Sequence, residues 1–186
     1  MYQSAPAYVI VPLIGADGAG KTTLWRALGE AAQQRDPAVA PRSIQMQGGS
    51  ASLFDVRYGA PSALQIVDFA DAFAEQILFG ATRFGAAVLV VSATESVVEG
   101  TRQSVERAQL FGVPIVAVAL TQCDKVDDVE MTDLIVLEVR ELLNKYRMGG
   151  DQTTVVPMPG LRMTARGGRE PEMAGGADVL LQTLCR

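Results

Sequence analysis

The residues with the clearest chemical role follow a short apolar run near the N-terminus and have the spacing of a phosphate-binding loop. The stretch GADGAGKT, residues 15–22, fits the pattern G-x-x-x-x-G-K-[ST]. Glycines let successive backbone N–H groups wrap around phosphate oxygens, the lysine brings a positive charge to the terminal phosphates, and the hydroxyl binds Mg²⁺. A loop that merely turns the chain is the alternative. The predicted nucleotide-binding residues are Gly15, Asp17, Gly18, Ala19, Gly20, Lys21, Thr22 and Thr23.

Two carboxylates further along the chain extend this prediction. Asp68 ends a predicted strand, where a carboxylate can hold Mg²⁺ together with Thr22; an aspartate in an ordinary turn is the alternative. Asp124 follows another apolar strand, and its carboxylate suits the N1 and N2 edge of guanine, with Gln122 as a second candidate for the nucleotide. The alternative for Asp124 is a role as the N-cap of the next helix.

The composition is that of a folded, acidic domain. Hydrophobic residues make up 48% and charged residues 20%, which is close to the globular average, so disorder is not expected. The formal net charge of -5 argues against broad nucleic-acid binding, which depends on Lys and Arg at phosphates. The absence of histidine removes the commonest general base, and the two cysteines lack metal-type spacing. No basic signal-peptide start or membrane-length apolar run is present, so we expect a cytoplasmic protein without membrane contact.

Apolar runs alternate with amphipathic stretches, the pattern of an α/β fold with a mainly parallel sheet. Strands are predicted at residues 8–14, 51–58, 63–68, 86–91, 114–120 and 154–158. Helices are predicted at residues 21–35, from about 73, and at 99–111, 128–146 and 177–185. We therefore expect a three-layer P-loop NTPase fold, with a mostly parallel six-stranded sheet and helices on both faces.

Proline and glycine residues interrupt the segments that lie between the predicted helices and strands. Prolines and glycines make residues 36–49 irregular, and residues 159–176 are predicted to be a flexible loop. The sequence shows no internal repeat, so residues 1–186 are expected to form one domain.

Downstream of the loop, the sequence resembles the GTP-binding domain of elongation factor Tu and its translational GTPase relatives. The resemblance is dense in GAAVLVVSATE (residues 85–95) and continues through Thr101-Arg102 and FGVP (residues 111–114). It extends through CDKVDD (residues 123–128) and EVRELLNKY (residues 138–146). It implies a G domain that binds GDP or GTP with Mg²⁺.

The resemblance also exposes changes in the elements that surround the γ-phosphate. The family's DxxGH element reads Asp68-Phe69-Ala70-Asp71-Ala72. Asp71 therefore stands at the glycine whose amide meets the γ-phosphate, and Ala72 at the histidine that positions the attacking water. No threonine occurs between Thr23 and Thr82, where the family has a switch threonine on Mg²⁺. Asp71 could also turn outward or bind Mg²⁺ itself.

The base-recognition elements have changed as well. The family's NKxD reads Thr121-Gln122-Cys123-Asp124, so only the carboxylate is kept, and the SAL element aligns with Pro159-Gly160-Leu161. Whether adenine is then also accepted is open.

These observations predict a stand-alone, degenerate GTP-binding domain that favours GDP, hydrolyses GTP slowly or not at all and acts as a regulator, with a possible protein partner. Because Ala72 replaces the family's histidine, no catalytic residue is assigned. The first alternative is an active GTPase completed by a partner. The second is a P-loop nucleotide kinase, whose arginines Arg162, Arg166 and Arg169 would come unusually late in the chain.

Overall fold

The computed structural model describes residues 7–46, 49–57, 62–69, 84–126, 129–158 and 171–185. The strands are β1 (Ala7–Ile14), β2 (Arg42–Met46), β3 (Gly49–Arg57), β4 (Ser62–Phe69), β5 (Ala87–Ser92), β6 (Ile115–Thr121) and β7 (Thr154–Met158). The helices are α1 (Lys21–Arg35), α3 (Glu99–Leu110), α4 (Val129–Lys145) and α5 (Pro171–Leu184), with a 3₁₀ helix at Cys123–Lys125.

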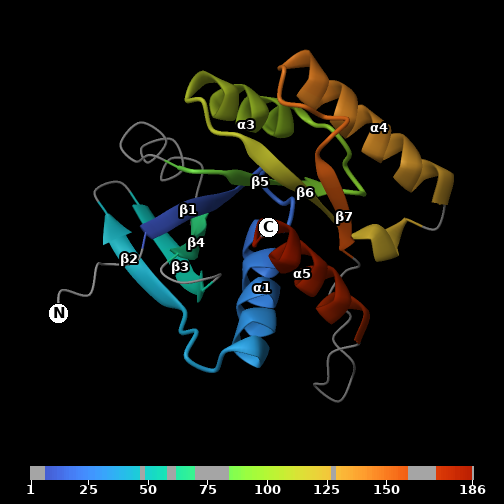
Figure 1. Cartoon of the computed structure of the whole chain (residues 1–186). Helices are drawn as coiled ribbons and strands as arrows, with labels where there is room; N and C mark the ends of the chain where they lie inside the picture. The colour runs from blue at the N-terminus through green and yellow to red at the C-terminus, as the bar shows by residue number, and fades with distance from the viewer. Residues whose placement is uncertain are drawn as a thin grey trace.

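The strands form one sheet in the order β2-β3-β4-β1-β5-β6-β7 (Figure 1). β1 pairs in parallel with β4 and β5, and parallel pairing continues from β5 to β6 and from β6 to β7. Only β2 with β3 and β3 with β4 are antiparallel. Because parallel strands end at the same edge, the carboxyl ends of β1, β4, β5, β6 and β7 lie there, where α/β proteins bind their ligands.

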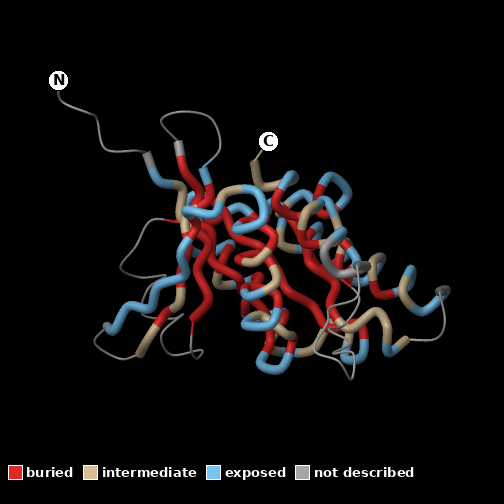
Figure 2. The backbone as a smooth tube through the Cα atoms, turned by 90° about the horizontal axis from the view of Figure 1, so that it is seen from below, coloured by how far each residue is buried: buried red, intermediate tan, exposed pale blue. Residues whose placement is uncertain are grey.

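Helices cover both faces of the sheet. Figure 1 shows α1 and α5 on one side and α3 and α4 on the other. Each side has its own apolar core: Leu28 and Leu181 belong to the first, and Val105 and Leu143 to the second. Figure 2 shows buried segments in the interior of the molecule and exposed segments at its surface. The predicted three-layer α/β fold is therefore confirmed.

The central strands owe their position to uninterrupted apolar sequence. Every residue of β5 is buried, and β6 is buried except at Val116. A strand covered by helices on both faces needs apolar side chains at every position rather than at alternate ones. These strands form the rigid base from which the loops of the site project.

The prediction of six strands was wrong, because the described residues alone form a sheet of seven. The additional strand, β2, lies within the stretch that was predicted to be irregular, and it pairs with β3 as an edge hairpin. Its residues from Arg42 to Gln45 are exposed, so the sequence carries no apolar alternation there. Strand β2 is therefore held by its pairing with β3, which includes an ion pair of 3.0 Å between Arg42 and Asp55, rather than by burial of its side chains.

The remaining boundaries agree to within a residue or two, with one exception. Helix α5 begins at Pro171 instead of residue 177, so the predicted loop was too long at its C-terminal end. Residues 159–170 and the helix predicted from about residue 73 lie outside the described residues. Within the part of the chain that the structure describes, no helix has the length and hydrophobicity to cross a bilayer.

Candidate nucleotide-binding site

The predicted phosphate loop connects β1 to α1 at the edge where the parallel strands end. Gly15 leaves β1 directly against β5, and a Cβ added there would lie 2.2 Å from the Val90 carbonyl oxygen. Gly20 has φ +91° and is the N-cap of α1. No side chain caps this helix, and its first turn holds no acidic residue. Its N–H groups and positive dipole end are therefore available to an anion.

The lysine of the motif closes over the loop. Lys21 Nζ donates hydrogen bonds to the carbonyl oxygens of Gly15 (2.9 Å) and Ala16 (2.8 Å). The Lys21 side chain is only 13% exposed, which fixes the ammonium group at the mouth of the loop. An ammonium has three protons, so these two bonds leave one for a phosphate oxygen.

Asp17 takes a different position from its neighbours. Its side chain is 90% exposed and lies 3.9 Å from Lys21 Nζ. An exposed ion pair at this distance contributes little. The prediction that Asp17 contacts the nucleotide therefore depends on its backbone N–H group. Thr23 is also exposed, on the first turn of α1.

The predicted magnesium ligands come together. Asp68, near the end of β4, is only 4% exposed, and it accepts a hydrogen bond from the side chain of Thr22. Burial raises the pKa of Asp68, while Thr22, Lys21 and Arg26 partly offset that rise. The Oδ1 atom of Asp68 is buried without a hydrogen-bond partner among the described residues. A buried carboxylate oxygen beside a hydroxyl is a good fit to Mg²⁺, which prefers oxygen ligands and would relieve the cost of the buried charge.

The loop after β6 approaches the phosphate loop from the other side. Thr121, at the end of β6, is only 8% exposed, and its Oγ1 lies 2.6 Å from the Ala19 carbonyl oxygen and 3.1 Å from that of Val91. A hydroxyl has a single proton, and the shorter distance assigns it to Ala19. Thr121 was interpreted from the sequence as the loss of an asparagine, but its hydroxyl ties the loop to the end of β6. The signal for this role is a hydroxyl residue placed where a buried strand ends.

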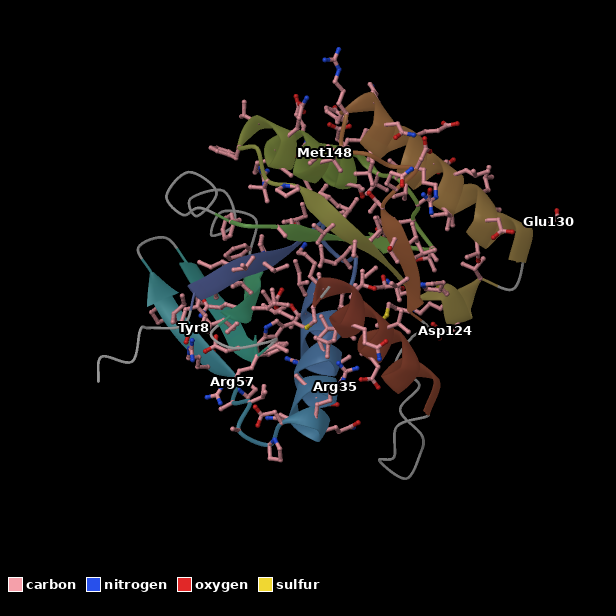
Figure 3. All side chains as sticks on the ribbon, viewed as in Figure 1. Tyr8, Arg35, Arg57, Asp124, Glu130 and Met148 are labelled. Atoms are coloured by element: carbon pink, nitrogen blue, oxygen red, sulfur yellow. The ribbon has the colours of Figure 1, made fainter. Side chains whose placement is uncertain are left out.

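The neighbouring residues complete this contact. Gln122 has φ +59°, and its Nε2 donates to the Gly18 carbonyl oxygen at 3.4 Å. Lys125 Nζ donates to Gln122 Oε1 at 2.7 Å. Asp124 is half-buried in the 3₁₀ helix beyond β6 (Figure 3). Burial raises the pKa of the Cys123 thiol, so this cysteine stays protonated at neutral pH.

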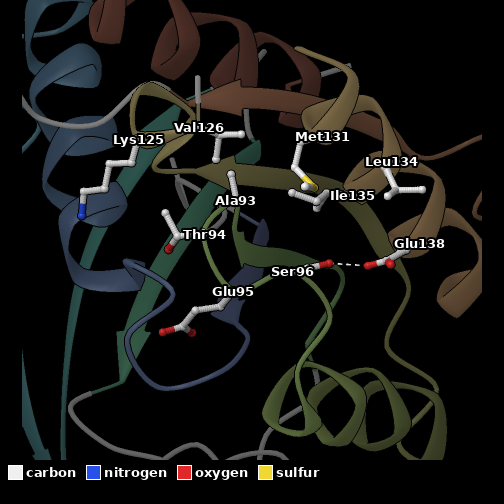
Figure 4. A pocket seen from close by; sticks show the side chains of 10 residues that line it. All are labelled: Ala93, Thr94, Glu95, Ser96, Lys125, Val126, Met131, Leu134, Ile135 and Glu138. Atoms are coloured by element: carbon white, nitrogen blue, oxygen red, sulfur yellow. Dashed lines mark hydrogen bonds between the residues drawn. The ribbon is translucent and has the colours of Figure 1, made fainter. Parts of the chain in front are cut away.

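A second hollow, of about 380 Å³, lies between the β5–α3 loop and α4 (Figure 4). Ser96, at φ +56°, donates a hydrogen bond to Glu138 across it, and Val126 and Ile135 line it. None of the predicted nucleotide-binding residues lines this hollow. It is therefore separate from the phosphate site, although Lys125 stands at its rim.

Other predicted residues lie outside the part of the chain that the structure describes. They include Asp71 and Ala72 in the altered DxxGH element and Pro159-Gly160-Leu161 at the SAL position. Their proposed effects remain predictions from the sequence.

A glycine loop between a strand and a helix, an inward lysine, and a threonine–aspartate pair define a P-loop nucleotide-binding domain. The loop after β6 brings a second carboxylate, Asp124, to the same edge of the sheet. The chain belongs to the family of the elongation factor Tu GTP binding domain, which matches residues 7–185. This confirms the resemblance seen in the sequence and supports guanine-nucleotide binding.

The first prediction concerns the buried charge of Asp68. Without metal, Asp68→Asn should raise the melting temperature, because it removes a charge that burial disfavours. Burial raises the pKa of Asp68 in the folded state above the ordinary carboxyl value. Below that ordinary value the wild type has its full stability, because the carboxyl is protonated in both the folded and the unfolded state. As the pH rises through the raised pKa, the wild type loses this stability, because the unfolded state ionises more readily than the folded state. In thermal unfolding, the gap between variant and wild type should therefore widen as the pH rises above the ordinary carboxyl pKa, and it should level off once the folded-state carboxyl has ionised.

Asp17→Asn is the matched control, because its side chain is 90% exposed. It should show no such gap. Mg²⁺ with GDP should stabilise the wild type and leave Asp68→Asn nearly unchanged. An Asp68→Asn protein that is less stable than the wild type at every pH would contradict this assignment.

The second prediction concerns the tether to Ala19. Thr121→Val removes the donor and leaves a buried carbonyl oxygen unpaired, which costs about 1–3 kcal/mol of unfolding free energy. Urea denaturation measures this loss, and GDP affinity should fall with it. Thr121→Ser keeps the hydroxyl and should retain most of both. Equal stability of the valine variant and the wild type would contradict the tether.

Proposed function

We propose that this domain binds guanine nucleotide through an intact phosphate site, favours GDP over GTP, turns GTP over slowly or not at all, and acts as a regulatory module in the cytoplasm. The observation that carries the proposal is the position of the Lys21 ammonium, held on two loop carbonyls at the open N-terminus of α1. This arrangement recognises phosphates whatever base they carry.

Thr22 and Asp68 are the residues that would hold Mg²⁺. The ion would supply positive charge to neutralise the phosphate oxygens. Lys21 adds a second positive charge, and the N–H groups of the loop and of α1 orient the phosphate chain. These contacts all involve parts of the nucleotide that GDP retains.

The proposal of slow turnover depends on Ala72. The family has a histidine at this position, and a group that positions or deprotonates the attacking water contributes roughly 10²–10⁴ in rate. Alanine has no side-chain donor or acceptor. A domain of this kind is expected to keep the nucleotide rather than consume it, which suits a binding or regulatory role.

The proposed preference for the diphosphate depends on Asp71. It stands at the family's glycine that meets the γ-phosphate. Two like charges ~4 Å apart repel by about 4 kcal/mol at an effective dielectric near 20. A triphosphate would bear that repulsion, whereas a diphosphate would not.

Base selection in this proposal depends mainly on Asp124. The residues that precede it have changed from the family's asparagine and lysine, yet Thr121 and Gln122 still contact the phosphate loop. Support of the loop and recognition of the base are therefore separable here. Guanine offers the carboxylate N–H groups at N1 and N2, whereas adenine has no N–H at either of these positions.

The third prediction is a ranking of nucleotides. In calorimetric titrations with Mg²⁺, GDP should bind most tightly, GTP more weakly, and ADP and ATP more weakly still. Lys21→Ala should weaken GDP binding about 10- to 100-fold, because it removes a charge-assisted contact.

Equal affinity for all four nucleotides would mean that the site binds phosphates without selecting a base, and it would overturn the assignment of guanine. Measurable single-turnover GTP hydrolysis that Lys21→Ala abolishes would favour an active GTPase instead. Phosphoryl transfer from ATP to nucleoside monophosphates would favour a kinase.

The fourth prediction isolates Asp71. Asp71→Gly should raise GTP affinity while leaving GDP affinity unchanged, because only the γ-phosphate meets the altered position. Asp151→Gly serves as a control that removes an exposed carboxylate elsewhere. If the ratio of GTP to GDP affinity is the same in wild type and Asp71→Gly, the electrostatic explanation fails.

A further inference from the structure

We infer that Lys125, which lies outside the altered base-recognition motif, is a positioning residue of the nucleotide site that acts through Gln122. Its ammonium group fixes the Gln122 amide, and that amide anchors Gly18 of the phosphate loop. The inference rests on the proposed function, since it assigns Lys125 a role in holding the nucleotide.

The local backbone brings the two side chains together. Gln122 precedes the 3₁₀ helix Cys123–Lys125, and the Lys125 N–H donates to the Gln122 carbonyl oxygen at 3.0 Å. In a 3₁₀ helix, residues three apart lie above one another. The side chains of Gln122 and Lys125 therefore emerge on one side, and Lys125 Nζ reaches Gln122 Oε1 at 2.7 Å.

The chemistry of the three groups allows one orientation of the amide. An ammonium only donates and a carbonyl oxygen only accepts. Lys125 must therefore face Gln122 Oε1, and Gly18 must face Nε2. Without the lysine, the amide loses the contact that holds its oxygen away from the loop.

The anchored carbonyl belongs to a peptide that closes the loop. In a trans peptide, C=O and N–H point in opposite directions. Holding the Gly18 oxygen with Gln122 directs the Ala19 N–H the other way, where it donates to the Ala16 oxygen at 3.3 Å. The bond closes a turn around Asp17 and Gly18, and the contact with Gln122 stabilises that turn from outside.

The described residues offer the Lys125 ammonium no competing ion pair. Among the described residues, no carboxylate lies within ion-pair distance of Lys125 Nζ. In Figure 4 the Lys125 side chain extends away from Met131 and the other residues of the second hollow. Although Lys125 is exposed, its ammonium group contacts Gln122, the residue that bonds to the phosphate loop.

The fifth prediction follows from this relay. Lys125→Met should speed dissociation of fluorescent GDP about three- to tenfold, the effect of losing one charge-assisted hydrogen bond, with little change in association rate. Lys145→Met is the matched control, because it also removes one exposed positive charge, from the end of α4. It should leave dissociation unchanged, and Lys125→Arg should keep it close to the wild type.

A double-mutant cycle separates this role from a general charge effect. In a Gln122→Ala background, Lys125→Met should have no further effect, because the amide through which it acts is gone. Additive effects would overturn the inference, as would a dissociation rate for Lys125→Met equal to that of the wild type.

Hydrogen exchange of the nucleotide-free protein tests the relay without any ligand. Lys125→Met should speed amide exchange in peptides covering residues 15–20, and Lys145→Met should not. If the wild type binds no guanine nucleotide, the proposed function fails while this measurement still decides the relay. Unchanged exchange in the loop would overturn the relay itself.

Discussion

The phosphate site depends on where the carbonyl oxygens of one short loop point. Lys21 holds those of Gly15 and Ala16, Gln122 holds that of Gly18, and Thr121 holds that of Ala19. Each bond fixes a peptide plane, and the N–H at the other end of that plane points the opposite way. A loop held by its oxygens has its peptide planes fixed before an anion binds, so less conformational freedom is lost on binding.

The sheet supplies the fixed points for these bonds. Thr121 is the last residue of β6, whose strand is almost completely buried, and its hydroxyl lies within 3.1 Å of the β5 carbonyl of Val91. Gly100, in the first turn of α3, lies so close that a Cβ would be 3.0 Å from the Ala16 Cβ. Strand ends and one helix start therefore support the loop, and the contacts come from segments far apart in the sequence.

These contacts explain what the two replaced residues of the base-recognition motif do in this protein. In the family resemblance, replacing asparagine and lysine by Thr121 and Gln122 looks like a loss of base recognition. In the structure, both replacements bond to the phosphate loop, so part of the motif's structural role is kept by different chemistry. Nucleotide retention and nucleotide turnover can then diverge, because the residues that support the loop are not those at positions 71 and 72.

The sequence predicted the parts of the fold that follow from local pattern. The loop from Gly15 to Thr22 has a fixed spacing, and β5 and β6 are continuous apolar runs, so both were predictable. Strand β2 was not, because its exposed residues depend on pairing with β3 rather than on burial. The roles of Thr121 and Lys125 were also missed, since the bond from Thr121 to Ala19 joins residues 102 positions apart. A hydroxyl at the end of a buried strand indicates that a side-chain donor is available there, but no local pattern identifies the distant carbonyl that it reaches.

In the proposed function, the phosphates held by this anchored loop provide most of the nucleotide's binding energy. The most direct test compares the affinities of GDP and guanosine for the wild-type protein in the presence of Mg²⁺. We expect clear saturable binding of GDP and none of guanosine over the same concentration range. Equal binding of the two, or no binding of GDP, would contradict it.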